Sequence, residues 1–124
     1  MLDYRQYLIL IMQNKICVVT GSNTGIGKST AIGLATLGAE VVMVCRNQAK
    51  GEKSRQQIIK ESKNNAVHLF IADLSSMNEV RKLSKEIHLK FNKIDVLINN
   101  AGIITLHRQS TVDGYEYQLS VNYL

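Results

Sequence analysis

A cluster of three glycines marks the part of the sequence whose residue types indicate a specific chemistry. Gly21, Gly25 and Gly27 follow an apolar run and open a segment with helical spacing. A strand-to-helix turn directs free backbone N–H groups and the positive end of the helix dipole at one spot, which suits a pyrophosphate. Gly21 would permit a tight turn, Gly25 a close approach of the backbone to phosphate, and Gly27 close packing of the helix against the sheet. We therefore expect a phosphate-binding loop formed by Gly21, Ser22, Asn23, Thr24, Gly25, Ile26 and Gly27.

The spacing of these glycines allows three interpretations. The usual dinucleotide fingerprint, G-x-G-x-x-G, needs glycine where this sequence has Asn23 and Ile26, so the motif is a variant with the spacing G-x-x-x-G-x-G. The P-loop of nucleoside triphosphatases is nearly met by Gly27, Lys28 and Ser29, but its first glycine would fall at Ser22. A glycine-rich turn without a ligand is the third interpretation. The position between strand and helix favours the dinucleotide, and the other two stay open.

The end of the second apolar run bears on which dinucleotide would bind. An acidic residue at this place binds the adenosine ribose 2′-OH of NAD. This sequence has Arg46 instead, between Cys45 and Asn47, and a guanidinium can form charge-assisted hydrogen bonds to a 2′-phosphate. Lys50 would add positive charge one helical turn later. We expect NADP rather than NAD, with a solvated arginine at a helix start as the alternative for Arg46.

Four short apolar runs, rich in β-branched residues, predict the strands that would position these residues. They are mostly apolar on both faces, which is typical of parallel strands covered by helices on both sides. The runs are Lys15–Thr20, Glu40–Cys45, Val67–Ala72 and Ile94–Asn99.

Helical segments connect the strands, and one of them opens with Ser76 and Glu79 in the spacing of a capping box. Alternating strands and helices form right-handed crossovers. The fold class is therefore α/β, a partial Rossmann-type doubly wound parallel sheet of about four strands in the order 3-2-1-4. The helical segments are Ile26–Leu37, ending at Gly38, then Gln48–Ser62, Met77–Lys90 and finally Val112–Leu124.

Length and composition limit the class of protein. The 124 residues suit one domain, which we divide into an N-terminal extension at 1–13 and an NAD(P)-binding Rossmann domain at 14–124, truncated at its C-terminal end. The net charge of +5 is spread along the chain, so we expect no nucleic-acid partner. The longest apolar stretch, Leu8–Met12, is too short for a membrane span.

Cysteine and histidine usage indicates the compartment and the metal content. Cys17 and Cys45 lie in apolar runs and form no C-x-x-C pair, which favours core thiols in a reducing compartment, the cytoplasm. The three histidines are dispersed and lack carboxylates at ligand spacing, so we expect no metal site.

Two motifs together connect the sequence to a known family. The glycine motif at Thr20–Gly27 is joined by Asn99–Gly102 at the end of the fourth predicted strand. With this pair the sequence resembles the short-chain dehydrogenase/reductase family from about Lys15 to Leu124. The members most similar to it are retinol-dehydrogenase-like, on the evidence of Cys45–Asn47, Asp73 and Leu74, Asp113 and Gly114, and Val121 and Asn122.

The resemblance implies roles for residues that follow the third and fourth strands. Asp73 would accept a hydrogen bond from the adenine amino group, and the backbone of Leu74 would line that pocket. Asn100, Ala101 and Gly102 would border the ribose and steady the sheet. These residues follow the carboxyl ends of strands, where open α/β sheets bind ligands. The alternative for Asp73 is a turn residue or helix cap.

The resemblance also implies an oxidoreductase that interconverts a small-molecule carbonyl and an alcohol by hydride transfer. Asn122 matches the catalytic asparagine of the family, which holds a water in the proton relay, although spacing alone would make it a surface helical residue. The family also uses a serine and a Tyr-x-x-x-Lys pair, and none of the five tyrosines has lysine four positions later. We expect an inactive amino-terminal half of a protein of roughly twice the length, and we expect that full-length protein to be a homo-oligomer. The alternative is a non-catalytic dinucleotide-binding sensor or interaction module.

Overall fold

The computed structural model describes residues 1–103 and 105–123, and its centre is a four-stranded sheet. All three strand pairings are parallel, and the strand order is β3-β2-β1-β4. The α/β fold class and the order 3-2-1-4 predicted from the sequence are therefore confirmed. The strands are β1 (Ile16–Thr20), β2 (Glu40–Cys45), β3 (Val67–Ile71) and β4 (Val96–Ile98).

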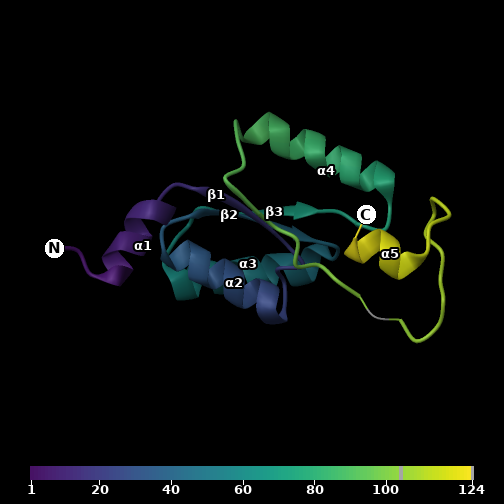
Figure 1. The fold of residues 1–124 in the computed structure, drawn as a ribbon, viewed down its shortest axis with the longest axis horizontal. Coiled ribbons are helices and arrows are strands. Elements are labelled where there is room, and N and C mark those ends of the chain that lie inside the picture. Colours follow the sequence, from purple (N-terminus) through teal and green to yellow (C-terminus); the bar gives the residue numbers. More distant parts are fainter. Residues whose placement is uncertain (104, 124) are drawn as a thin grey trace.

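Helices cover both faces of this sheet, as Figure 1 shows. α2 and α3 lie together against one face, and α4 lies against the other. α5 lies beyond the edge of the sheet toward which the β3 arrow points. The described helices are α1 (Tyr4–Met12), α2 (Gly25–Thr36), α3 (Gln48–Ser62), α4 (Met77–Lys90) and α5 (Tyr117–Asn122).

The core consists of two apolar clusters separated by the sheet, and the central strand β2 contributes to both. Val41 and Met43 pack on the side of α2 and α3, while Val42 and Val44 pack on the side of α4. Because alternate residues of a strand face opposite sides, a strand buried on both faces is apolar throughout. This packing accounts for the unbroken apolar run from which the strand was predicted.

β4 is shorter than the predicted strand at Ile94–Asn99 and is only partly covered. It spans Val96–Ile98, lies at the edge of the sheet and pairs with β1. The side chain of Leu97 is 56% exposed, whereas β1 and β2 are almost completely buried. The prediction of a strand buried on both faces is therefore wrong for β4.

Side chains add hydrogen bonds to the backbone at both ends of β4. At its start, the Asp95 carboxylate accepts a hydrogen bond from Ile16 N at 2.8 Å. At its end, Thr20 Oγ1 accepts hydrogen bonds from Asn100 N and Ala101 N, each at 3.0 Å. At the start the backbone pairing continues, since Asp95 N donates to Ile16 O at 2.9 Å, whereas beyond Ile98 the Thr20 hydroxyl is the acceptor for the two backbone N–H groups.

The last helix is also shorter than predicted. The sequence predicted helical structure over Val112–Leu124, but α5 spans Tyr117–Asn122, and Leu124 lies outside the described residues. Gly114 adopts a φ of +82° in a turn, which breaks helical continuity. Glu116 then caps α5 by accepting hydrogen bonds from the two backbone N–H groups of residues 118 and 119, at 3.2 and 2.8 Å.

The predicted capping box of α4 forms only in part. Ser76 Oγ accepts a hydrogen bond from Glu79 N at 3.4 Å, as a capping box requires. The Glu79 carboxylate, however, accepts from Asp73 N at 2.9 Å instead of from Ser76 N. Glu79 therefore connects the start of α4 to the end of the β3 segment.

The segment before β1 contains a helix that the sequence did not predict. α1 begins after Asp3, whose carboxylate accepts from Gln6 N at 2.8 Å while the Gln6 side chain accepts from Asp3 N at 3.0 Å. This reciprocal pair is a complete capping box. Across residues 1–103 and 105–123, each helix is either too short or too polar to cross a bilayer.

The Asp95 carboxylate makes the stability of the contact between β1 and the start of β4 dependent on pH. The hydrogen bond from Ile16 N lowers the pKa of Asp95, burial opposes this, and Lys93 adds to the lowering. Because the folded pKa lies below the ordinary value of about 3.9, the stabilisation is complete above that pH. It is lost as the pH falls through the lower pKa of the folded protein.

We predict that Asp95→Asn reduces this pH dependence. Asparagine keeps an oxygen that can accept from Ile16 N but has no titrating group. The free energy of unfolding, measured with urea at about pH 6 and about pH 3, should therefore fall less on acidification in the variant than in the wild type. Glu61→Gln, which alters an exposed carboxylate on α3, should behave as the wild type. Equal losses in Asp95→Asn and wild type would contradict the prediction.

Candidate functional site

The carboxyl ends of the parallel strands converge on a cavity of about 290 Å³, here named the strand-end cleft. Because the strands are parallel, the residues after each of them meet at one edge of the sheet. Residues far apart in the sequence therefore share one surface. The lining residues are Gly21, Asn23, Thr24, Val44, Cys45, Arg46, Ala72, Asp73, Leu74, Asn100, Ala101, Gly102, Ile103, Tyr117 and Val121.

The loop between β1 and α2 forms one wall of the cleft. Gly21 has a φ of +63°, and its N–H donates to Val44 O at 2.9 Å. A Cβ at Gly21 would lie 2.8 Å from Ala101 Cα, so a larger residue does not fit. Gly25 also has a positive φ, +57°, and faces open space. The turn therefore depends on glycine at both positions.

The N-terminus of α2 differs from the other helix starts in residues 1–103 and 105–123. Thr24 occupies the N-cap position but makes no side-chain hydrogen bond to the helix, whereas side chains cap α1, α3, α4 and α5. The first turn of α2 contains no acidic residue. The first N–H groups of a helix need partners from outside it. Those of α2 are available to an anion at the cleft.

Gly27 and Asn100 fix the loop against the segment after β4. Asn100 Nδ2 donates to Gly21 O at 3.1 Å. A Cβ at Gly27 would overlap both Gly21 O and Asn100 Nδ2. Gly27 thus permits close packing, as expected. The atoms closest to it belong to the turn at Gly21 and to Asn100 after β4. Ser54 of α3 adds a hydrogen bond of 2.6 Å to Asn23 O.

Two charged side chains, Arg46 and Asp73, lie at the ends of β2 and β3. Asp73 Oδ1 accepts from Ser75 N at 2.9 Å and from Ser75 Oγ at 2.6 Å. Burial raises the pKa of Asp73, but these hydrogen bonds and the positive charge of Arg46 outweigh it, so that the pKa is lowered overall. Asp73 is therefore ionised near neutral pH. It can accept a hydrogen bond from a ligand while also stabilising its own turn.

Some residues expected in the site do not line the cleft. Gly25 and Gly27 belong to the first turn of α2, directly after Thr24, and Ser22 is completely buried, with its hydroxyl 3.8 Å from Cys45 Sγ. Ile26 is 80% exposed. Asn122 lines a neighbouring cavity. The remaining expected residues, Gly21, Asn23, Thr24, Arg46, Asp73, Leu74, Asn100, Ala101 and Gly102, line the cleft.

The side chain of Asn122 makes two hydrogen bonds to the backbone. Its Oδ1 accepts from Ile103 N at 2.7 Å, and its Nδ2 donates to Ile103 O at 2.8 Å. Gln118 adds hydrogen bonds to Thr105 O and Thr105 Oγ1, at 3.2 and 3.0 Å. These contacts hold α5 beside the segment that follows β4. In this arrangement the Asn122 amide positions the helix.

Sequence reasoning missed six residues of the cleft. Val44 and Cys45 end β2, and Ala72 directly follows β3, so their place could have been inferred from the parallel sheet alone. Tyr117 and Val121 are four positions apart on α5, a spacing that places them on one helix face. The complete set is Val44, Cys45, Ala72, Ile103, Tyr117 and Val121.

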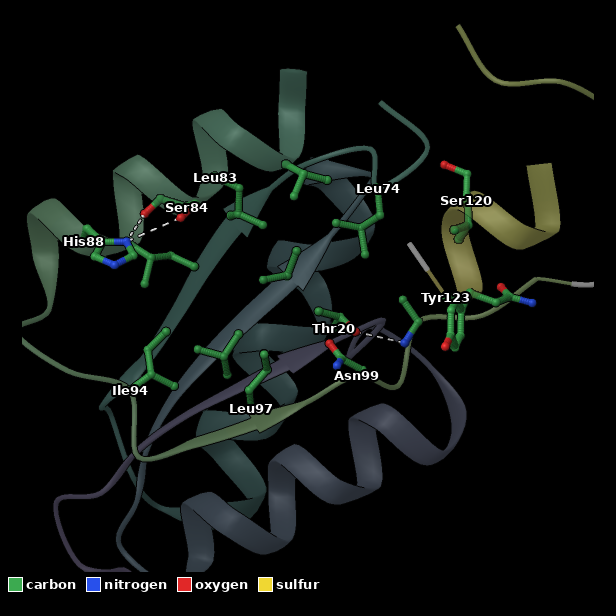
Figure 2. Close-up of a pocket in the computed structure, with 17 residues that line it drawn as sticks. Thr20, Leu74, Leu83, Ser84, His88, Ile94, Leu97, Asn99, Ser120 and Tyr123 are labelled. Carbon is green, nitrogen blue, oxygen red and sulfur yellow. Dashed lines mark hydrogen bonds between the residues drawn. The ribbon is translucent and has the colours of Figure 1, made fainter. Parts of the chain in front are cut away.

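A second cavity, also of about 290 Å³, lies between α4 and β4. Figure 2 shows Leu83, Ile94 and Leu97 around it, with Ser120 and Tyr123 of the α5 segment at one end. Its lining is mainly apolar side chains, and the exposed Leu97 contributes to it. It touches the strand-end cleft through shared residues, Val44, Leu74, Ala101 and Val121.

Both cysteines are free and buried. Burial raises the pKa of the Cys17 thiol and that of the Cys45 thiol, and the hydrogen-bond contact with Ser22 offsets this only partly at Cys45. Such thiols are poor nucleophiles and poor metal ligands. Within residues 1–103 and 105–123, His, Cys, Asp and Glu side chains form no group of three that would hold a metal ion.

A parallel sheet in the order 3-2-1-4, with a glycine turn and an uncapped helix at its carboxyl edge, defines a Rossmann-type domain. Residues 15–123 match the model of the family described as short chain dehydrogenase. The chain belongs to this family, and the family resemblance inferred from the two sequence motifs is confirmed.

Individual relatives agree with this assignment. Retinol dehydrogenase 13 of Homo sapiens is 39% identical over 110 residues, which cover 89% of this chain and 33% of that protein. The chain thus spans about a third of that relative's length. A crystal structure of a protein from Mycobacterium paratuberculosis is 35% identical with a TM-score of 0.77, covering 90% of this chain and 38% of that one. A metagenomic short-chain oxidoreductase in complex with NADP is 29% identical with a TM-score of 0.68, covering 74% and 41%.

The packing of Gly27 leads to a prediction with an internal control. Gly27→Ala places a methyl group on Gly21 O and Asn100, so it should lower the free energy of unfolding by about 1–3 kcal/mol. Gly33 lies in the same helix and faces open space, so Gly33→Ala should raise the free energy of unfolding by about 0.5–1 kcal/mol. Urea unfolding followed by circular dichroism measures both. Similar effects of the two substitutions would contradict the close contact at Gly27.

Proposed function

We propose that the chain is the NADP-binding portion of a short-chain oxidoreductase that interconverts a carbonyl and an alcohol by hydride transfer. The observation that carries this proposal is the uncapped N-terminus of α2, which opens on the strand-end cleft behind the Gly21 turn. A nicotinamide dinucleotide has a pyrophosphate that these N–H groups can bind. When bound, the coenzyme supplies or accepts the hydride.

The lining residues suit the other parts of such a coenzyme. Asp73 presents an ionised carboxylate that can accept from an adenine amino group, and Leu74 offers an apolar wall beside it. Asn100, Ala101 and Gly102 follow β4 and border the same cleft. We infer that they contact the ribose. Asn122 would serve the reaction by fixing α5 against Ile103, because both polar atoms of its amide are engaged there.

The preference for NADP over NAD rests on Arg46. Its side chain is exposed at the end of β2 and lines the cleft, where an acidic residue would favour an unmodified ribose. A guanidinium binds phosphate oxygens through charge-assisted hydrogen bonds. The metagenomic relative in complex with NADP supports the same choice.

We propose further that the 124-residue chain binds the coenzyme without turning it over. None of its five tyrosines precedes a lysine by four positions, so the sequence contains no Tyr-x-x-x-Lys general acid. The same observation favours a second candidate, a non-catalytic dinucleotide-binding module. Consumption of NADPH by the purified chain with aldehydes or ketones would contradict both statements.

The two free, buried thiols favour a reducing compartment, the cytoplasm.

We predict that Arg46→Asp weakens NADPH binding by about ten- to one-hundredfold, because it removes charge-assisted hydrogen bonds to the 2′-phosphate. NADH binding should change much less, since NADH lacks that group. Isothermal titration calorimetry with both coenzymes measures the two affinities. Lys53→Asp makes the same charge change at an exposed position on α3 outside the cleft and should leave the ratio unaltered. Equal losses for both coenzymes would remove Arg46 from the site.

A separate substitution tests the pyrophosphate position. Gly25→Val introduces a branched side chain at a φ of +57° beside the first N–H groups of α2. NADPH and NADH should both lose affinity by about tenfold or more, because close approach of the phosphates is blocked. Gly38→Val is the matched control and should leave both affinities unchanged, since Gly38 also has a positive φ, +88°, and follows the other end of α2, outside the cleft. Unchanged coenzyme affinity in Gly25→Val would refute binding at this loop.

A further inference from the structure

Tyr117 and Arg46 meet in the strand-end cleft although they are 71 residues apart. Arg46 Nη1 donates a hydrogen bond of 3.4 Å to Tyr117 Oη. Arg46 comes from the end of β2, and Tyr117 is the first residue of α5. The contact therefore joins the charged end of the cleft to a helix that follows the last strand.

The backbone around Tyr117 is held firmly. Tyr117 N donates to Gln109 O at 2.8 Å, next to an isolated antiparallel bridge between Ser110 and Glu116. Glu116 caps α5, and Gln118 binds Thr105. The phenol ring of Tyr117 thus extends into the cleft from a fixed support.

A restraint on the Arg46 side chain lowers the entropic cost of binding a ligand there. This side chain is exposed, and a free arginine loses rotamer entropy when it is ordered. A group held in place before the ligand arrives avoids part of that loss. The acceptor on Tyr117 is a neutral hydroxyl, so it orients the guanidinium without cancelling its charge. The guanidinium has five donors, which leaves others for a phosphate.

We propose that Tyr117 is a positioning residue for coenzyme selectivity, which holds the Arg46 guanidinium toward the 2′-phosphate of NADP. This inference rests on the proposed function, since it assumes a dinucleotide in the strand-end cleft. It assigns to α5 a part in the choice between NADP and NAD. The choice then depends on two distant segments of the chain.

Calorimetry on Tyr117→Phe tests the proposal, because phenylalanine keeps the ring and removes only the hydroxyl. NADPH affinity should fall about three- to tenfold, the effect of one lost hydrogen bond, and NADH affinity should stay the same. The probes 2′,5′-ADP and 5′-ADP should show the same difference. In an Arg46→Ala background, Tyr117→Phe should cause no further loss for NADPH, since its effect passes through the guanidinium.

Tyr115→Phe is the control, because it removes a hydroxyl from the same segment outside the cleft, and it should bind both coenzymes as the wild type does. Equal losses for NADPH and NADH in Tyr117→Phe, no loss for NADPH, or an undiminished loss in the Arg46→Ala background would each overturn the positioning role. Failure of the wild-type chain to bind either coenzyme would overturn the proposed function, and this inference with it.

Discussion

The uncapped start of α2 is the constraint around which the rest of the site is arranged. Backbone N–H groups at a helix terminus need acceptors, and here the N-cap residue Thr24 supplies no side-chain acceptor. The preceding loop is compressed against the sheet, because Gly21 leaves no space for a Cβ beside Ala101. The Ser54 hydroxyl donates a hydrogen bond to the carbonyl oxygen of Asn23, which would otherwise repel an anion. The loop is thereby shaped to present donors and to withhold acceptors.

Sequence patterns predicted the parts of the fold that depend on burial. β2 is apolar at every position from Val41 to Cys45 because both faces pack against helices, and that run is visible in the sequence. The alternation of strands and helices then indicated right-handed crossovers, and the order 3-2-1-4 followed from the Rossmann-type fold class. The glycine loop could also be predicted, because backbone conformation and close contacts require glycine at its key positions.

Features that depend on pairings between distant side chains were not predictable. β4 spans only Val96–Ile98, and beside its two ends the side chains of Asp95 and Thr20 accept hydrogen bonds from backbone N–H groups of distant segments. The start of α5 at Tyr117 is different, because it depends on local signals, the turn at Gly114 and the cap at Glu116, which prevail over the helical spacing of the preceding residues. Periodicity reports which residues are apolar, and it carries no information about such partners.

The charges of the cleft show how one surface can offer both an acceptor and a donor to a ligand. Asp73 is ionised because Ser75 and Arg46 outweigh the cost of its burial, so a carboxylate and a guanidinium occupy the ends of neighbouring strands. If each simply neutralised the other, neither would be left to recognise a ligand. Ser75 supplies two hydrogen bonds to Asp73, and Tyr117 supplies a neutral partner to Arg46. Because each charge has its own uncharged partner, the acceptor and the donor can act on different groups of the same molecule.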